Sequence, residues 1–305
     1  MSAPEAVERD YPLSRLTTVR AGGSADFFAR PETEDRVIEL LAWAEAQGLP
    51  VGVVGSGSNL LVSDQGFRGL VMKLAGGLTR VERDGNRIVC GGGARLPSAA
   101  AKAAGWGLMG LEFGVNIPGT VGGAVRMNAN AYGGELGRVL DRVTVCTPGG
   151  AEERRPEDLG FRYRGSNLAE RDVVALAAFA LAEANPADVK ATMANMRRRR
   201  KEAQPSGIKT FGSTFMNPED ARADGRSAGQ LLDAADCQGL EIGGARLSPK
   251  HANFVENTGG ATTADILQLM AEARRRVHDR FGVVLEPEVQ VLGEVSWPEG
   301  WQLEP

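Results

Sequence analysis

Cysteine and histidine are scarce in this sequence, whose 305 residues include three cysteines and two histidines. Cys90, Cys146 and Cys237 lie far apart and form no CxxC pair. This spacing argues against a disulfide framework and against a zinc site, so we expect no bound metal. It also favours a reducing, cytoplasmic setting.

Long apolar segments are missing as well. The longest apolar run, residues 173–182, is too short to span a membrane. The first 13 residues, MSAPEAVERDYPL, lack the apolar core of a signal peptide. We therefore expect a cytoplasmic protein with no membrane partner.

Neither sign of charge dominates, because 35 basic and 39 acidic residues give a formal net charge of −4. No overall basic field favours nucleic acid as a partner. The run RRRRK at residues 197–201 could contact phosphates. It ends a predicted helix, however, where cations complement the helix dipole, and no aromatic residues interleave with it.

Glycine, by contrast, is abundant: 40 of 305 residues, about 13%, against a usual ~7%. The richest segment is residues 114–134, GVNIPGTVGGAVRMNANAYGG. Its pattern fits neither an amphipathic helix nor an ordinary strand. Such a segment lets the backbone approach a ligand closely with its N–H groups directed at it. A large anionic ligand such as a dinucleotide is the candidate, and a long structural turn is the alternative.

A second glycine-rich loop, GSGSN at residues 55–59, follows a predicted strand. It is not GxGxxG, because residue 60 is leucine, and the chain contains no GK[ST] of a phosphate-binding P-loop. Its small hydroxyls and N–H groups suit a pyrophosphate, although a simple strand exit would look similar. Two such loops favour one shared ligand.

The chain opens with a predicted strand, helix and strand, which favours an α/β beginning. Thr33 is expected to cap the first helix and Gly48 to end it. Asp84-Gly85-Asn86 predicts a hairpin. The expected domains are residues 1–76, 77–203 and 204–305. The expected strands are residues 25–29, 51–54, 71–74, 79–83, 87–91, 142–146, 173–181, 253–257 and 283–293. The expected helices are residues 33–47, 97–105, 187–203, 227–235 and 263–281.

Several motifs in order carry a resemblance to a known family. They are VGSGSNLLV, GLEFGVNIPGTVGGAVRMNANAYGGE, FRYRGS, FGSTFMNP, SAGQLLDAAD, GARLSPKHANFVEN and LEPEVQVLG. Together they resemble the UDP-N-acetylenolpyruvoylglucosamine reductases (MurB), a family of the para-cresol methylhydroxylase-type FAD proteins. The resemblance runs over roughly residues 13 to 293.

The resemblance implies an α+β fold: two FAD-binding subdomains followed by a C-terminal α+β substrate-binding domain. It implies non-covalent FAD in a cleft between the first two domains, with residues 17–27 supporting the flavin. The implied FAD contacts come from both glycine-rich loops: Gly55, Ser56, Gly57, Ser58, Asn59, Leu60, Asn116, Pro118, Gly119, Thr120, Gly122, Gly123, Ala124, Asn128 and Ala129.

The resemblance also selects Arg164, Ser213 and Glu288 as catalytic residues. From the residues alone, Arg164 would be an exposed arginine and Ser213 a turn residue. Alternation places Glu286 and Glu288 on one strand face and cannot choose between them. A guanidinium can bind a carboxylate bidentately as its charge develops. A serine hydroxyl can act as a general acid only toward a very basic carbanion or enolate.

The implied reaction uses NADPH as hydride donor and reduces UDP-N-acetylglucosamine enolpyruvate to UDP-N-acetylmuramate for peptidoglycan precursors. A monomer is expected. The family often has a basic residue where this chain has Met216, so Lys209 or Lys250 is expected to face the diphosphate instead. His251 and Asn253 are further candidates near the substrate, and His251 could equally be a core histidine.

Two other functions were considered. Residues 225–229 spell G-x-S-x-G around Ser227, but the preceding EDARADGR is too polar for the strand that a hydrolase elbow needs. An oxidase or dehydrogenase of the same flavin superfamily is the second alternative. Those proteins often tether FAD through histidine or cysteine, and neither occurs in the two glycine-rich loops.

Overall fold

The computed structural model describes residues 4–302 and forms two compact units. Unit 1 contains the chain up to Tyr11, Ala25–Ser56 and Arg68–Arg200. Unit 2 contains Pro12–Ser24, Gly57–Phe67 and the chain from Lys201. The division into three domains at residues 76 and 203 stays a prediction.

The first sheet of unit 1 has the order β1-β2-β5-β3. Its strands are β1 Glu8–Pro12, β2 Ser24–Ala29, β5 Phe67–Met72 and β3 Val51–Val53, and β3 and β5 run parallel. Helix α1 (Glu34–Ala46) connects β2 and β3. Thr33 caps it by accepting a hydrogen bond from Arg36 N (3.3 Å), and Gly48 follows its end with φ +64°. The predicted strand-helix-strand opening is confirmed.

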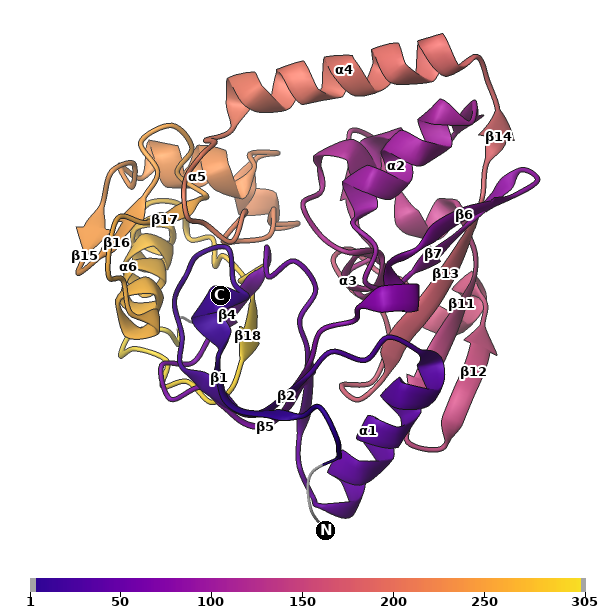
Figure 1. Ribbon diagram of the computed structural model, residues 1–305. Helices are drawn as coiled ribbons and strands as arrows, with labels where there is room; N and C mark the ends of the chain where they lie inside the picture. Colours follow the sequence, from indigo (N-terminus) through magenta and orange to yellow (C-terminus); the bar gives the residue numbers. More distant parts are fainter. Residues whose placement is uncertain (1–3, 303–305) are drawn as a thin grey trace. The chain divides into compact units, whose positions relative to one another are not determined.

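The second sheet of unit 1 is antiparallel, in the order β12-β11-β13-β7-β6 (Figure 1). Its hairpin turns at Gly85 and Asn86, as predicted, with Gly85 at φ +59°. Its strands are β6 Val81–Asp84, β7 Arg87–Gly91, β11 Leu140–Thr147, β12 Gly150–Arg154 and β13 Val173–Ala180.

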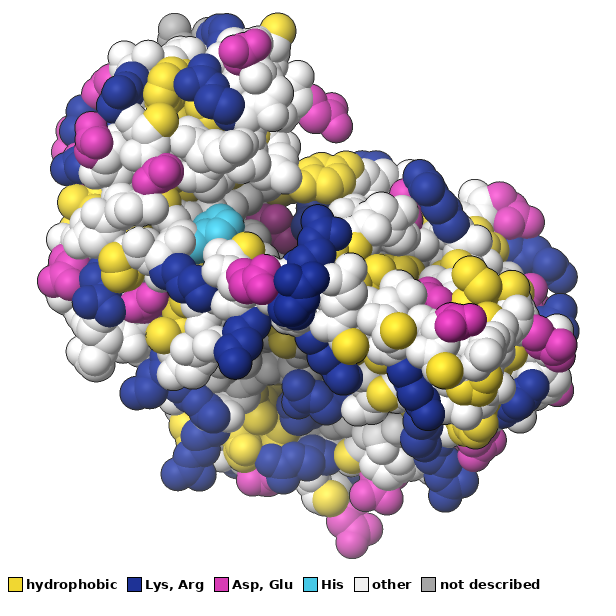
Figure 2. Space-filling view, turned by 90° about the horizontal axis from the view of Figure 1, so that it is seen from above, with side chains coloured by type: hydrophobic (Ala, Val, Ile, Leu, Met, Phe, Trp, Pro, Cys, Tyr) yellow, Lys and Arg dark blue, Asp and Glu magenta, His cyan; other side chains and the backbone are white. Residues whose placement is uncertain are grey.

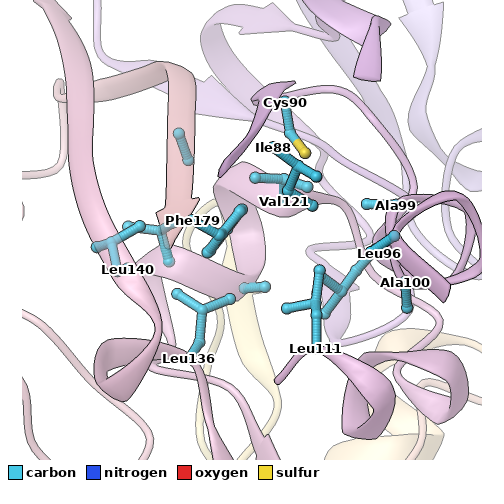
Figure 3. Packing of buried hydrophobic residues seen from close by; sticks show 14 of the residues in the cluster. Ile88, Cys90, Leu96, Ala99, Ala100, Leu111, Val121, Leu136, Leu140 and Phe179 are labelled. Carbon is cyan, nitrogen blue, oxygen red and sulfur yellow. The ribbon is translucent and has the colours of Figure 1, made fainter. Parts of the chain in front are cut away.

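Helices cover both faces of this second sheet. Residues of α1 pack with Cys146, Val173 and Ala175 on one face. On the other face, α2 (Leu96–Gly105) and α3 (Val121–Arg126) pack with side chains of β7, β11 and β13. Figure 3 shows Val121, the first residue of α3, beside Ile88 and Cys90. Burial raises the pKa of the Cys90 thiol to about 12.

Unit 1 also contains short strands and most of a long helix. The strands are β8 Leu108–Met109, β9 Asn130–Ala131, β10 Gly134–Glu135 and β14 Ala182–Glu183; the helix is α4 Pro186–Ala203, which enters unit 2 at Lys201. Helix α3 lies inside the glycine-rich segment, where the sequence predicted no helix. Its apolar residues Val121, Ala124 and Val125 are buried, so tertiary packing stabilises a helix that its two glycines disfavour.

Unit 2 packs two helices with short strands. The helices are α5 Ala228–Ala234 and α6 Thr263–Phe281; the strands are β4 Leu60–Val62, β15 Glu241–Ile242, β16 Ala245–Leu247, β17 Val255–Asn257 and β18 Gln290–Leu292. The predicted strand at 283–293 is wrong over its first part. Its first part forms only an isolated bridge between Pro287 and Phe215, and the regular strand begins at Gln290, which pairs with Leu60 of β4.

The core of unit 2 joins three separate pieces of chain. Val19, Ala21 and Leu61 pack with buried residues between Phe211 and Val289. The Asp64 carboxylate accepts hydrogen bonds from Thr263 N (2.8 Å) and Ala264 N (3.0 Å) at the start of α6. A carboxylate there also complements the helix dipole. The early segments are therefore integral parts of this unit.

Hydrophobic side chains form separate groups among polar and charged ones on the face shown in Figure 2. Among residues 4–302, the exposed large hydrophobic residues are Val53, Met109, Tyr132, Tyr163 and Trp297. None of the helices within residues 4–302 combines the length and the apolar character needed to cross a bilayer.

Candidate active site

Gly55 of the first glycine-rich loop contacts Thr120 of the second, and both residues lie in unit 1. A β-carbon on Gly55 would lie 2.2 Å from Thr120 Oγ1, so the backbone of the first loop touches the second loop there. Lys73 Nζ donates to Gly55 O (2.5 Å) from the adjoining β5 segment. Burial, and then the charges of Arg30 and Arg95, lower the pKa of Lys73. The predicted pairing of these loops is thus present at Gly55 and Thr120.

Backbone hydrogen bonds fix the start of α3. Val121 N donates to Ala94 O (2.8 Å), and Gly122 N donates to Gly92 O (2.8 Å). A β-carbon on Gly92 would lie 1.8 Å from Val174 O, so glycine is required where this loop crosses the sheet. The glycine-rich segment therefore has a fixed backbone where it packs against the second sheet.

Two glycines of this segment have no such structural need. A β-carbon on Gly119 would meet nothing closer than 3.9 Å, and one on Gly123 nothing closer than 3.5 Å. Neither residue has positive φ. Packing and backbone conformation would both admit alanine at these two positions, so the segment leaves room there for close approach of a ligand, and a contact of either glycine with a ligand stays a prediction.

The predicted contact residues Asn116 and Asn128 use their side chains within the chain. Asn116 Nδ2 donates to Met196 O (2.8 Å). Asn128 Nδ2 donates to Glu135 Oε1 (2.6 Å), and its Oδ1 accepts from Gly137 N (3.0 Å). Asn128 is buried and has φ +39°, which asparagine tolerates better than most residues. These carboxamides shape the loop, and a direct contact of either with a ligand stays a prediction.

Asn59, Ser213 and Glu288 belong to one neighbourhood in unit 2. Glu288 N donates to Thr214 O (2.8 Å), beside Ser213. Asn59 Nδ2 donates to Glu288 O (3.1 Å), and Gln290 N donates to Asn59 O (3.1 Å). The Glu288 backbone is thus bonded to Thr214, the residue after the predicted acid, and to the side chain of Asn59 in the first glycine-rich loop. Residues far apart in sequence meet here.

Asn253 fixes the backbone segment that follows Ser213. Its Oδ1 accepts from Phe215 N (2.9 Å), and its Nδ2 donates to Phe215 O (2.8 Å). Asn253 O accepts from Thr214 N (2.8 Å), and Ser213 forms a bridge with Phe254. Both ends of this buried carboxamide are occupied, so Asn253 holds the backbone beside Ser213 instead of facing a ligand.

His251 is a packed histidine. Its ring lies edge-on to Phe254, with 4.9 Å between centroids, and its Nδ1 accepts from Asn253 N (3.3 Å). Burial lowers the pKa of this imidazole, which favours the neutral form with the proton on Nε2. The ring is half-buried and bonded to backbone, and a contact of His251 with substrate stays a prediction.

Glu286 and Glu288 flank Pro287, which forms an isolated bridge with Phe215. Met216 N donates to Glu286 O (2.8 Å) and Glu288 N donates to Thr214 O (2.8 Å), so both residues adjoin the segment that follows Ser213. The exposed Glu286 carboxylate pairs with Arg274 (Oε1 to Nη2, 3.3 Å), whereas Glu288 O accepts from Asn59 Nδ2 (3.1 Å). The shared face of the two carboxylates stays a prediction.

Arg164 lies at the tip of a tight turn in unit 1. Arg162 and Gly165 exchange backbone hydrogen bonds of 3.1 Å in each direction, with Tyr163 and Arg164 between them. Arg164 has φ +56°, a conformation that costs a non-glycine residue about 1–2 kcal/mol. Its Nη1 donates to Asn130 O (3.4 Å) in the glycine-rich segment. Strain of this kind is concentrated at functional sites.

The other functions considered from the sequence find little support. Ser227 is the N-cap of α5 in a capping box with Gln230, and a 3₁₀ turn (Ala221–Ala223) precedes it where a hydrolase elbow needs a strand. In the basic run of α4, Arg200 donates to Asn116 O and Arg199 stacks over Tyr132. Two of its arginines are therefore engaged within unit 1.

Comparison with known proteins identifies the family. A family model described as "UDP-N-acetylenolpyruvoylglucosamine reductase, C-terminal domain" matches residues 204–292, and one described as "FAD binding domain" matches residues 25–154. UDP-N-acetylenolpyruvoylglucosamine reductase 2 of Symbiobacterium thermophilum is 42% identical, over 96% of this chain and 94% of its own. The chain belongs to the UDP-N-acetylenolpyruvoylglucosamine reductase family.

Two further members support this assignment. The UDP-N-acetylenolpyruvoylglucosamine reductase of Geobacillus kaustophilus is 41% identical, over 94% of this chain and 93% of its own. The crystal structure of the reductase (MurB) from Thermus caldophilus has a TM-score of 0.81 at 37% identity, and the match covers 94% of this chain and 98% of that one. The α+β fold expected from the resemblance, with an FAD-binding part and a C-terminal part, is confirmed.

FAD is the cofactor of the reductase family, and the residues present fit it. Gly119 and Gly123 lie within the matched FAD-binding domain and leave the backbone of the glycine-rich segment open. Gly55 and Thr120, which touch, both lie in unit 1. Small residues and backbone N–H groups of this kind are suited to a pyrophosphate.

Substitution of Gly123 by alanine tests this fit. We expect the protein without FAD to unfold at an equal or slightly higher temperature, because alanine is the better helix former. We expect FAD to bind ~10-fold or more weakly, since a β-carbon would occupy space needed for close approach of the ligand. Gly105→Ala is the matched control, because its β-carbon would meet nothing within 4 Å and Gly105, like Gly123, lies in a helix, here α2. Equal FAD affinities of both variants, measured by fluorescence titration, would contradict this assignment.

Proposed function

We propose that this chain catalyses the NADPH-dependent, FAD-mediated reduction of UDP-N-acetylglucosamine enolpyruvate to UDP-N-acetylmuramate, through Arg164, Ser213 and Glu288. The observation that carries the assignment of residues is the hydrogen-bonded neighbourhood of Asn59, Thr214 and Glu288, which joins the Ser213 segment to the first glycine-rich loop. It occurs in a chain that matches reductases of this name along nearly its whole length.

Arg164 is proposed to bind the carboxylate of the enolpyruvyl group. Addition of a hydride to the β-carbon moves negative charge toward this carboxylate. A planar guanidinium can bind both carboxylate oxygens, and it binds them more strongly as the charge grows. Interactions that strengthen in the transition state are the ones that accelerate the reaction. The strained turn at Tyr163 and Arg164 supports this role.

Ser213 is proposed to donate its hydroxyl proton to the α-carbon. When bound, FAD supplies the hydride that reaches the β-carbon, having received it from NADPH. The α-carbon then carries carbanion or enolate character and is basic enough to take a proton from an alcohol. Glu288 is proposed to lie near this enolate and to tune its protonation together with Arg164. The link from Glu288 N to Thr214 O supports a common site for Ser213 and Glu288.

FAD is proposed to be held non-covalently by the residues predicted from the resemblance in both glycine-rich loops. NADPH and the UDP-sugar are the proposed small-molecule partners. A cytoplasmic location and a monomeric state belong to the same proposal. Lys250 Nζ donates to Lys201 O (2.8 Å), so Lys209 is proposed as the base that faces the substrate diphosphate in place of Met216.

A visible spectrum of the purified protein tests this function. We expect a flavin spectrum that NADPH bleaches and that the enolpyruvyl sugar restores. Precipitation with acid should leave the yellow colour in solution, because no histidine or cysteine lies in either glycine-rich loop to tether FAD. Colour in the pellet would favour the oxidase alternative, and failure of the sugar to restore the spectrum would refute the proposed reaction.

A further inference from the structure

Arg126 has a largely buried guanidinium that binds backbone carbonyls within unit 1. It is the last residue of α3, and its guanidinium donates to three backbone carbonyls of one neighbouring segment. Nη1 donates to Leu168 O (3.1 Å), and Nη2 donates to Ala169 O (3.0 Å) and Asp172 O (2.7 Å). Burial lowers the pKa of this guanidinium, whereas Asp172 and Glu170 act in the opposite direction. Hydrogen bonds from a charged donor are stronger than neutral ones.

The same segment returns a hydrogen bond to α3. Ser166 Oγ donates to Arg126 O (2.9 Å), so Arg126 is bound through both its side chain and its backbone. The Asp172 carboxylate also accepts from Ala169 N (3.0 Å) and from Arg154 Nη1 (2.7 Å). These contacts fix residues 166–172 against the C-terminal end of α3 and against β12.

The turn that carries Arg164 directly precedes this fixed segment. Arg162 Nη1 donates to Ser166 O (3.1 Å), and Arg162 O accepts from Asn128 Nδ2 (3.4 Å). Arg164 itself is held at φ +56°. A strained residue persists only where its surroundings determine its conformation. These surroundings include the charged hydrogen bonds from the Arg126 guanidinium and the hydrogen bond that Ser166 returns to Arg126 O.

We propose that Arg126 is a positioning residue for Arg164. Its guanidinium fastens residues 166–172 to the end of α3, and this anchor holds the turn at Tyr163 and Arg164 in the geometry that binds the substrate carboxylate. The inference rests on the role of Arg164 in the proposed function. Arg126 thereby links the glycine-rich segment, which contains α3, to the arginine that acts on substrate.

Arg126→Met removes the donors and keeps most of the apolar stem. We expect FAD binding and bleaching by NADPH to stay within ~3-fold of the wild type, while re-oxidation by the enolpyruvyl sugar slows ~30-fold or more, because misplacement of a positioned group has effects of this size. Amide exchange should accelerate in a peptide covering residues 161–172 and stay unchanged in the strands of the second sheet. Arg87→Met, which removes one exposed ion pair with Asp141, should change none of these quantities.

A double-mutant comparison separates positioning from general structure. In an Arg164→Ala background, Arg126→Met should alter re-oxidation by less than ~2-fold, because the two residues act as one unit. A slowing there as large as in the wild-type background would overturn the proposal. So would normal re-oxidation in Arg126→Met while Arg164→Ala is slow, and that result would leave the proposed function intact. Normal re-oxidation in Arg164→Ala would refute the role of Arg164 and the positioning proposal together.

Arg126→Lys provides a second measurement should the methionine variant fail to fold. A lysine ammonium can donate to some of the three carbonyls that Arg126 binds, but it lacks the planar, multiply donating geometry of a guanidinium. We expect intermediate amide exchange in residues 161–172 and re-oxidation between those of wild type and Arg126→Met. Wild-type values for both quantities would overturn the need for a guanidinium.

Discussion

Ser213→Ala should retain FAD and still be bleached by NADPH, but its re-oxidation by the enolpyruvyl sugar should slow by ~10²-fold or more, as expected for loss of a general acid. The substitution removes one oxygen and leaves the backbone contacts of the segment, including the link from Glu288 N to Thr214 O. Stopped-flow absorbance of the flavin measures the two half-reactions separately. Only the half-reaction that needs the serine proton should change.

Ser227→Ala is the matched control for Ser213→Ala. It removes a hydroxyl that caps α5, so the free energy of unfolding should fall by about 1 kcal/mol. Both flavin half-reactions should keep their wild-type rates, and this result would also speak against a hydrolase centred on Ser227. If Ser213→Ala were re-oxidised at the wild-type rate, Ser213 would have no place in the mechanism.

Loss of the Arg164 guanidinium should impair turnover with the enolpyruvyl sugar by ~10²-fold or more, the scale found when one preorganised electrostatic contact to developing charge is removed. Arg164→Lys should recover only part of the rate, since an ammonium cannot form the planar bidentate pair with a carboxylate. Bleaching by NADPH should be nearly unchanged in both variants. Steady-state and single-turnover rates together check this expectation.

The left-handed backbone of Arg164 allows a control that separates strain from charge. Arg164→Gly should be as inactive as Arg164→Ala, but its fold should be about 1–2 kcal/mol more stable, because glycine adopts φ +56° without a penalty. Denaturant unfolding of the two variants measures this difference. Wild-type turnover in Arg164→Gly would show that the residue serves only the turn.

Local patterns in the sequence were sufficient to predict the long elements. Thr33 and Gly48 delimit α1, and α6 begins and ends at the predicted residues with Ile266, Leu267 and Met270 buried. Helix α3 escaped prediction because its six residues include two glycines and its stability comes from packing on the second sheet. The strand at 283–293 was overextended because its residues before Gln290 form only an isolated bridge, between Pro287 and Phe215, which depends on tertiary pairing.

The site was only partly accessible from the sequence. Glycine-rich loops indicated a ligand, but the contact of Gly55 with Thr120 joins residues 65 positions apart, which no local pattern can reveal. Alternation could not distinguish Glu286 from Glu288, because their difference lies in tertiary partners, Arg274 for one and Thr214 for the other. The anchoring role of Arg126 likewise depends on carbonyls more than forty residues away.

The three-piece construction of unit 2 has a consequence for biosynthesis. During translation, Pro12–Ser24 and Gly57–Phe67 leave the ribosome long before the chain from Lys201 that completes their core. Until then the side chains of Val19 and Leu61 lack the core residues that bury them, while most of unit 1 has already been synthesised and can fold. A fragment starting at residue 201 would lack these side chains and the Asp64 carboxylate that binds the start of α6. Unit 2 is thus completed only late in synthesis, and no single continuous fragment from residue 201 onward contains all of its core.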